Sequence, residues 1–171
     1  MQVDFVSRKG VGNMFQIDDL IDHKHSGVCR VLDIASLSAD PNAPLYYVLK
    51  PLYGEDKGTV LRIPVTNTIS LSPLLTKEEA THLVATWPHA DGLYEADAKR
   101  RKQRYESAIS TGDVNLFPEL LEGIRQKKAK EGHLNSMDQQ FFNRAQPIIY
   151  GEIATALGIA FEEVDAFLHD N

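Results

Sequence analysis

Residues 15–75 carry short runs of apolar, aromatic and β-branched residues and show no helical repeat. The runs are separated by segments rich in Gly, Pro, Asp and Asn, which are the residues that form turns. Short strands at this spacing predict a small, twisted, barrel-like antiparallel sheet. Pro64 has no backbone N–H to donate, so we expect it at an edge strand or at a strand end. The runs cover residues 27–35, 45–53, 59–65 and 68–71.

From Thr76 onward the hydrophobic period becomes that of helices. Thr76 with Glu79, and Ser136 with Gln139, each have the spacing of a capping box that opens a helix. Pro118 is compatible with a helix only in its first turn. The pattern therefore predicts an α+β fold, in which the antiparallel sheet is followed by an all-α part of about five helices. The expected helices cover residues 76–87, 94–110, 115–130, 136–157 (ended by Gly158) and 160–168.

Residues 1–13 stand apart from both patterns, because Met14 is a second possible start and the first coherent pattern begins there. We interpret these residues as a leader, which is an added segment, a misplaced start or a flexible arm. The chain is then divided into this leader (1–13), a β module over residues 14–75 and a helical domain over residues 76–171.

The composition favours a globular protein in a reducing compartment. Hydrophobic residues make up 43% of the chain, which is ordinary for a folded domain. No apolar run approaches the roughly 20 residues needed to cross a bilayer, and no signal-peptide pattern is present. Cys29 is the only cysteine, so no internal disulfide can form. We expect a cytoplasmic protein with no membrane contact.

One short stretch departs from the acidic character of the chain, whose net charge is −6. The sequence KRRKQR, residues 99–104, places five bases within six residues. With about 100° per residue, Tyr94 and Tyr105 fall on one stripe of the expected helix, while Lys99, Arg100 and Arg104 point outward. The outward bases either contact phosphates or form a solvated helix face, and the pattern alone does not decide between these. Because neither half of the chain is basic overall, any nucleic-acid contact is local.

Catalytic and metal-binding patterns are weak in this sequence. It contains no GxSxG, P-loop, GxGxxG or HExxH motif. His23, His25 and Cys29 lie within seven residues, but a metal site built from one such cluster without a second is uncommon. Cys29 lies within an apolar run and is interpreted as a buried small hydrophobe. Residues 126–130, QKKAK, are interpreted as a solvated helix end that favours the helix dipole. We expect no enzyme activity, no metal, no cofactor and no small-molecule substrate.

The order of segments resembles the CarD/CdnL family of bacterial transcription regulators. The similar segments are MFQIDDLIDHKHSGVCRVLDI, YYVLKPLY, LRIPVTN and LLTKEEA in the first half, and LYEADAKRRKQRYESAISTGDVN and AQPIIYGEIATALGIAFEEVDAFL in the second. The resemblance implies a Tudor-like β module that binds the β subunit of RNA polymerase. It also implies a helical domain that contacts promoter DNA at the upstream edge of the melted region and prolongs the life of the open complex.

The resemblance places polymerase contacts on residues 59–65. Arg62 matches a family arginine beside the polymerase-contacting strand, and Val60, Leu61 and Ile63 would supply edge backbone and apolar contact. The alternative is that Arg62 is a solubilising charge on an edge strand. A second base that is common in the family at the end of the preceding strand is absent, since ASLS occupies residues 35–38.

The resemblance also places DNA contacts in the helical domain. Tyr94 aligns with a family tryptophan that wedges into the minor groove, and a tyrosine can still stack on an unpaired base. The alternative is that Tyr94 is a core residue. The only tryptophan, Trp87, is expected to pack between the two modules. The phosphate-contact candidates that match a basic family stretch are Lys99, Arg100, Arg101 and Arg104.

The sequence thus predicts a transcription regulator that binds the RNA polymerase β subunit and contacts promoter DNA, stabilising or tuning the open complex. Docking on polymerase would raise the local concentration of DNA, so that a short basic stretch suffices in an acidic protein. Two alternatives stay open. One is a free-standing DNA-binding protein, and the other is a protein-interaction module whose basic helix is merely solvated.

Overall fold

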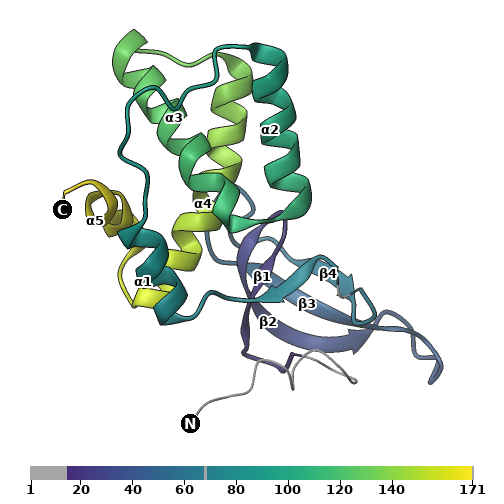
Figure 1. The fold of residues 1–171 in the computed structure, drawn as a ribbon. Coiled ribbons are helices and arrows are strands. Elements are labelled where there is room, and N and C mark those ends of the chain that lie inside the picture. The colour runs from purple at the N-terminus through teal and green to yellow at the C-terminus, as the bar shows by residue number, and fades with distance from the viewer. Residues whose placement is uncertain (1–14, 68, 171) are drawn as a thin grey trace.

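The computed structural model describes residues 15–67 and 69–170 of the chain. The predicted leader, residues 1–13, and Met14 lie outside the described residues, as do residue 68 and Asn171. Within the described part, an antiparallel five-stranded sheet is followed by five α-helices, which confirms the predicted fold class (Figure 1).

The strands of the sheet are ordered β4-β3-β2-β1-β5, and each neighbouring pair is antiparallel. β4 and β5 therefore form its two edges. Pro64 is the last residue of β4, in the edge position that its missing N–H requires. The run over residues 68–71 was predicted as a strand, but β5 begins only at Leu71. The strands are β1 (Leu20–His23), β2 (Gly27–Ser36), β3 (Leu45–Pro51), β4 (Leu61–Pro64) and β5 (Leu71–Pro73).

One face of the sheet closes over its own hydrophobic core. Tyr47 and Leu49 alternate with more exposed residues along β3, as expected for a strand with one buried face. Between Val31 and Asp33 the pairing of β2 with β3 shifts register, and the bulge increases the local twist. Cys29 is fully buried in this core, as predicted for a small hydrophobe.

The first helix begins at the capping box predicted from the sequence. The Glu79 backbone N–H donates to Thr76 Oγ1 at 3.1 Å, and the Thr76 N–H donates to Glu79 Oε2 at 2.8 Å. The fourth helix ends at Gly158, whose φ of 68° is the left-handed conformation of a C-cap. The helices are α1 (Lys77–Ala85), α2 (Ala98–Thr111), α3 (Phe117–Glu131), α4 (Ser136–Leu157) and α5 (Val164–His169), with short 3₁₀ turns η2 (Val114–Leu116) and η3 (Phe161–Glu163).

One predicted helix start and one predicted helix cap are wrong. α2 begins at Ala98 rather than Tyr94, because the Asp97 side chain accepts a hydrogen bond from the Arg100 N–H at 2.8 Å and caps the helix there. Tyr94 therefore lies in the preceding loop, outside the helical stripe assigned to it. At the start of α4, the cap is Asn135, which accepts from the Asp138 N–H at 2.9 Å, and not Ser136.

A second core lies among the helices and includes Trp87. Its side chain is only 3% exposed and belongs to the helical core, together with Tyr150 and Phe117. The prediction that Trp87 packs between the two parts of the chain is therefore wrong. Its ring meets Tyr150 of α4 edge-on, with centroids 6.3 Å apart.

α4 joins the helices to the sheet, and Figure 1 shows it passing from the far end of the helices down to the strands. At the contact, Gly27 at the start of β2 lies so close to α4 that an added Cβ would be 3.1 Å from the Ile148 Cα. Tyr53, in the segment after β3, stacks on Phe161, with ring centroids 5.1 Å apart. At these two contacts the sheet and α4 pack closely, with no room for a larger side chain at Gly27.

Gly151→Ala should destabilise this interface. A Cβ at residue 151 would lie 2.6 Å from the Tyr53 Cδ2, so the ring must leave its stacked position on Phe161. We expect the free energy of unfolding to fall by about 1–3 kcal/mol, as is usual for overpacking. Urea denaturation followed by circular dichroism measures the change. The double variant Gly151→Ala/Tyr53→Ala removes the clash, so it should lose less stability than the sum of the losses in the two single variants. A loss equal to that sum would contradict the proposed collision.

Candidate functional site

The edge strand β4 presents Arg62 on the face of the sheet opposite its core. Leu61 and Ile63 pack against the sheet core, whereas Arg62, between them, is exposed. In the antiparallel register Arg62 pairs with Val48 of β3. In the strand order β4 has one neighbour, β3, so the opposite edge of β4 is unpaired within the described sheet. The geometry leaves both the side chain and the strand edge open to a partner.

An apolar strip accompanies Arg62 on this face. Tyr46 and Val48 are half-buried and stand on the same face of β3, opposite Pro64 and Arg62. Val60, just before β4, is 47% exposed. No ion pair within the described residues involves Arg62. A free guanidinium beside exposed apolar side chains is the composition typical of an interface anchor.

At the other candidate site, the basic residues of α2 divide into three groups. Lys99 and Arg100 are exposed, and no ion pair is found for them in the part of the chain that the structure describes. Lys102 and Arg104 face carboxylates, Glu106 at 3.8 Å and Glu119 at 3.3 Å, in exposed pairs that contribute little stability and open easily.

Arg101 is different, because it is only 4% exposed. Its Nε donates to Asp138 Oδ1 at 2.7 Å, and an Nη donates to the Glu95 carbonyl oxygen at 3.0 Å. A guanidinium held in this way does not reach a phosphate. The prediction that it contacts DNA does not fit this geometry, and we leave Arg101 out of the candidate DNA contacts.

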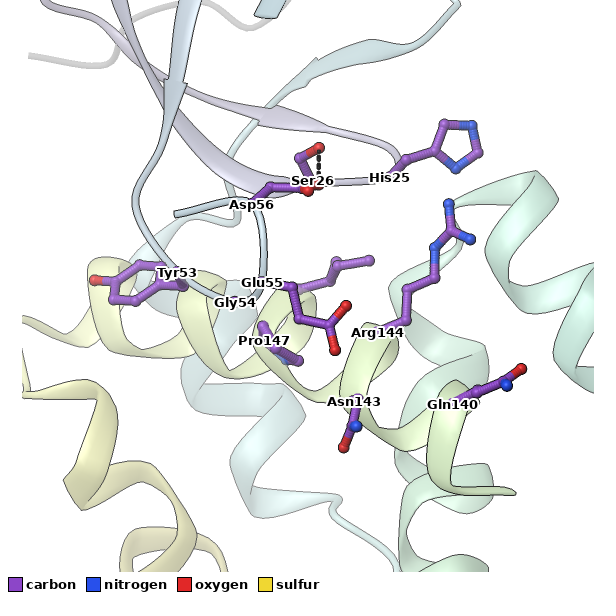
Figure 2. Close-up of a pocket in the computed structure, with 11 residues that line it drawn as sticks. His25, Ser26, Tyr53, Gly54, Glu55, Asp56, Gln140, Asn143, Arg144 and Pro147 are labelled. Atoms are coloured by element: carbon purple, nitrogen blue, oxygen red, sulfur yellow. Dashed lines mark hydrogen bonds between the residues drawn. The ribbon is translucent and has the colours of Figure 1, made fainter. Parts of the chain in front are cut away.

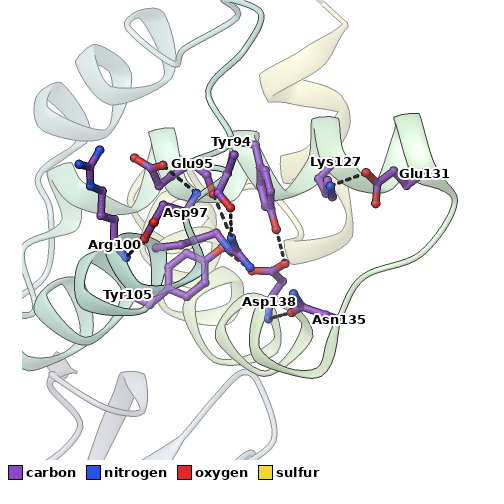
Figure 3. A network of polar contacts seen from close by, with 11 residues as sticks. Tyr94, Glu95, Asp97, Arg100, Tyr105, Lys127, Glu131, Asn135 and Asp138 are labelled. Carbon is purple, nitrogen blue, oxygen red and sulfur yellow. Dashed lines mark hydrogen bonds and ion pairs between the residues drawn. The ribbon is translucent and has the colours of Figure 1, made fainter.

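Asp138 collects three side-chain donors at the start of α4 (Figure 3). Besides Arg101, the Tyr105 hydroxyl donates to Oδ1 at 2.8 Å and the Tyr94 hydroxyl donates to Oδ2 at 2.7 Å. Asp138 itself is 1% exposed. Burial raises the pKa of Tyr94 to about 12, and the hydrogen bond to Asp138 and the charge of that residue act in the same direction. The same causes raise the pKa of Tyr105. Both phenols therefore stay protonated and act as donors.

Tyr94 is held from several sides rather than standing free. The Arg101 Cζ lies 4.6 Å from the centroid of its ring and the Lys127 Nζ lies 4.9 Å from it. These are the distances of cation–π contacts. Tyr94 is half-buried in the loop before α2, and it is not a member of the helical core.

A wide groove of about 950 Å³ runs past Tyr94. One wall comes from the start of α2, and the other from the end of α3 and the loop after it, which supply Lys127, Lys130 and His133. The end of α3 thus brings its lysines close to the start of α2, and Figure 1 shows both helix ends at the same end of the helical part. The interpretation of residues 126–130 as a solvated helix end did not predict that they lie close to the start of α2. The sequence could have indicated this proximity only through the tendency of consecutive helices to pack antiparallel.

The histidines and the cysteine do not come together as a metal site. His25 lies at a pocket of about 410 Å³ between the sheet and α4, and Figure 2 shows the Arg144 side chain extending from α4 toward His25. Burial and the charges of Arg144 and Lys24 lower the pKa of His25, so it is neutral at pH 7. Burial raises the pKa of Cys29 to about 12. Across residues 15–67 and 69–170, no three His, Cys, Asp or Glu side chains are grouped to hold a metal ion.

The structure thus combines a sheet that has an open, arginine-bearing edge with a following helical part. Residues 15–75 match the family model of the CarD-like/TRCF RID domain, and residues 89–169 match that of the CarD C-terminal domain. The chain belongs to the CarD-like family, and its sheet is a Tudor-like module. The CarD-like domains identify a transcription factor that interacts with RNA polymerase.

Comparison with individual curated proteins found no match. Within the described residues, every helix is too short or too polar to span a membrane.

Proposed function

We propose that this protein binds the β subunit of RNA polymerase through β4 and lays the basic end of its helices on promoter DNA, thereby stabilising or tuning the open complex. The unpaired edge of β4, with Arg62 exposed beside Val60, carries the proposal. An extended segment of the partner adds to such an edge through backbone hydrogen bonds, while Arg62 selects an acidic or carbonyl-rich partner surface. Leu61 and Ile63 hold β4 on the sheet core and position that edge.

The DNA part of the proposal rests on exposed bases. Lys99 and Arg100 are free to contact phosphates, and Arg104 becomes free when its exposed pair with Glu119 opens. Lys130, at the end of α3, lines the groove beside Tyr94, to which the start of α2 contributes Ala98 and Arg101. These few bases give only weak binding in a protein of net charge −6. Attachment to polymerase compensates, because it raises the effective concentration of DNA at these bases.

We also propose the division of the chain into a leader over residues 1–13, a polymerase-binding module over residues 14–75 and a DNA-contacting domain over residues 76–171. The protein would act in the cytoplasm, together with polymerase.

One observation favours the alternative of a protein-interaction module without DNA contact. The Tyr94 hydroxyl is tied to Asp138, so the ring is not poised to leave the protein surface. A free-standing DNA-binding protein is disfavoured by the net negative charge.

The proposal predicts that Arg62→Glu weakens binding to the polymerase β subunit by about tenfold or more, the effect of removing an interface anchor.

The double variant Lys99→Glu/Arg100→Glu should keep polymerase binding and shorten the lifetime of the promoter open complex. Binding is measured by surface plasmon resonance, and open-complex lifetime by competitor challenge. Lys77→Glu, an exposed charge reversal at the start of α1, is the matched control and should behave as wild type.

The outcomes separate the two candidate functions. Loss of the lifetime effect in both variants supports polymerase docking with DNA contact. A lifetime unaffected by Lys99→Glu/Arg100→Glu selects the protein-interaction module. Tyr94→Phe removes the hydroxyl bonded to Asp138 but keeps the ring, whereas Tyr94→Ala removes both. An open-complex lifetime that is unchanged in Tyr94→Phe and shortened in Tyr94→Ala would assign the ring to DNA stacking. Wild-type protein that does not bind polymerase overturns the proposal.

A further inference from the structure

The interface between the sheet and α4 buries two carboxyl groups that face each other. Asp22, on β1, is 5% exposed, and Glu152, on α4, is 2% exposed. Their carboxyl groups are in hydrogen-bonding contact. Two carboxylates cannot form a hydrogen bond with each other unless one of them carries a proton.

No cation balances this pair within the described residues. The groups that face Glu152 are Asp22, the carboxylate of Glu79 at the start of α1, and the backbone N–H of Leu75, which donates to Oε2 at 2.7 Å. The groups that face Asp22, besides Glu152, are Ser72 of β5, whose hydroxyl donates to Oδ2 at 3.5 Å, and the thiol of Cys29 on β2. The surroundings are therefore neutral or negative, and two ionised carboxylates would repel each other at low dielectric.

The remaining oxygen of Asp22 points to the same conclusion. Asp22 Oδ1 is buried and accepts no hydrogen bond from a conventional donor in the part of the chain that the structure describes. A buried oxygen left without a donor is costly, and the neighbouring carboxyl group of Glu152 can supply one when it is protonated. Burial and the negative charge of Asp22 raise the pKa of Glu152 to about 8, while burial raises the pKa of Asp22 to about 6. Burial and mutual repulsion thus keep one proton on the pair at neutral pH.

We propose that Asp22 and Glu152 share one proton at neutral pH and that this protonated pair fixes the sheet against α4, so that loss of the proton loosens the interface. The pair has one member on each side of the contact, and among the residues that the structure describes no ion pair joins the sheet to α4 there. This inference goes beyond the proposed function and does not depend on it. If the proposed function holds, the proton sets how firmly the polymerase-binding edge and the DNA-contacting helices are held relative to each other.

The direction of the pH effect follows from the two raised pKa values. The native state binds more protons than the unfolded state between the ordinary carboxyl pKa values and about pH 8. The contribution of the pair is therefore complete at low pH, declines as pH rises, and is lost as pH passes through about 8. Each extra proton held by the native state makes the unfolding equilibrium constant rise by up to about tenfold per pH unit.

The test compares the full chain with two variants by urea denaturation from pH 6 to pH 9. Glu152→Gln keeps an oxygen for the Leu75 N–H and offers Asp22 a permanent N–H donor. Between pH 6 and pH 8, we expect the unfolding equilibrium constant of the wild type to rise more steeply with pH than that of Glu152→Gln. The difference should be a factor of up to about ten for each pH unit. Glu162→Gln, an exposed carboxyl change on η3, should follow the wild-type profile. Equal slopes in wild type and Glu152→Gln overturn the proposal.

A second measurement keeps the proposal testable if Glu152→Gln does not fold. The carboxyl ¹³C resonances of Asp22 and Glu152 in the wild-type chain should report a proton lost from the pair near pH 8, and exchange of the Leu75 amide, corrected for its intrinsic rate, should accelerate over the same range. Asp22 and Glu152 carboxyl groups that both titrate near their ordinary pKa values of 3.8 and 4.5 overturn the shared proton. A titration near pH 8 without faster Leu75 exchange overturns the loosening of the interface.

Discussion

Replacing Asp138 with alanine is expected to lower the free energy of unfolding by about 3–5 kcal/mol, the cost of leaving a buried charge without its partner. Arg101 is 4% exposed and would remain as an uncompensated cation. Tyr94 and Tyr105 would lose the acceptor of their hydroxyl groups at the same time. Because these donors come from the loop before α2 and from α2 itself, the variant should also release the start of α2 from α4. Urea denaturation followed by circular dichroism measures the loss.

Two further variants show whether the charge is the cause. Asp138→Asn keeps one oxygen for Arg101 and Tyr105 but removes the negative charge, so its loss should be intermediate. The double variant Arg101→Met/Asp138→Leu replaces the ion pair with apolar side chains and should recover much of the stability lost in Asp138→Ala. A loss below about 1 kcal/mol in Asp138→Ala, the size of an ordinary hydrogen bond, would contradict a buried ion pair.

Trp87→Ala is expected to cost about 3–5 kcal/mol, the range for deleting a large aromatic side chain from a core. The ring is 3% exposed and meets Tyr150 edge-on. Its Nε1 donates to Glu122 Oε2 at 3.3 Å, and Glu122 is itself only 5% exposed. The variant therefore removes both the packing and one donor to a buried carboxylate. Circular dichroism is the appropriate probe, because the only tryptophan is lost.

Trp87→Phe separates the two contributions. It keeps most of the ring and loses the Nε1 donor, so about 1–3 kcal/mol of the loss should remain. A Trp87 that packed between the sheet and the helices, as the sequence suggested, would give another result. Trp87→Ala would then leave the helices intact and disturb only their attachment to the sheet, and a variant that unfolds in two separate transitions would support that arrangement.

Local rules predict the elements of this fold well. The capping box at Thr76 and Glu79 and the end of α4 at Gly158 depend on residues a few positions apart, and both are confirmed. The same holds for Pro64 at the end of an edge strand. The start of α2 was missed because the amphipathic stripe extends to Tyr94, whereas the Asp97 cap decides where the helix begins. A local hydrogen bond here outweighed periodicity.

The candidate site was less predictable, because its important contacts join distant residues. Arg101 lies in a run of five bases, and only its partner Asp138, 37 residues later, explains why it is buried. Conversely, Lys127 and Lys130 lie in an ordinary basic helix end and gain interest only because α3 returns to the start of α2. The exposure of Arg62 between Leu61 and Ile63 could be predicted, since strands alternate their faces.

The length of α4 fixes the distance between two of its contacts with the rest of the protein. Near its start, Asp138 binds Arg101 of α2, and 14 residues further on, Glu152 contacts Asp22 of the sheet. At 1.5 Å per residue Asp138 and Glu152 are separated by about 21 Å along the axis. Inserting one residue between them would turn one side chain by about 100° relative to the other and break one set of contacts. This stretch of the chain therefore tolerates changes of side chain far better than changes of length.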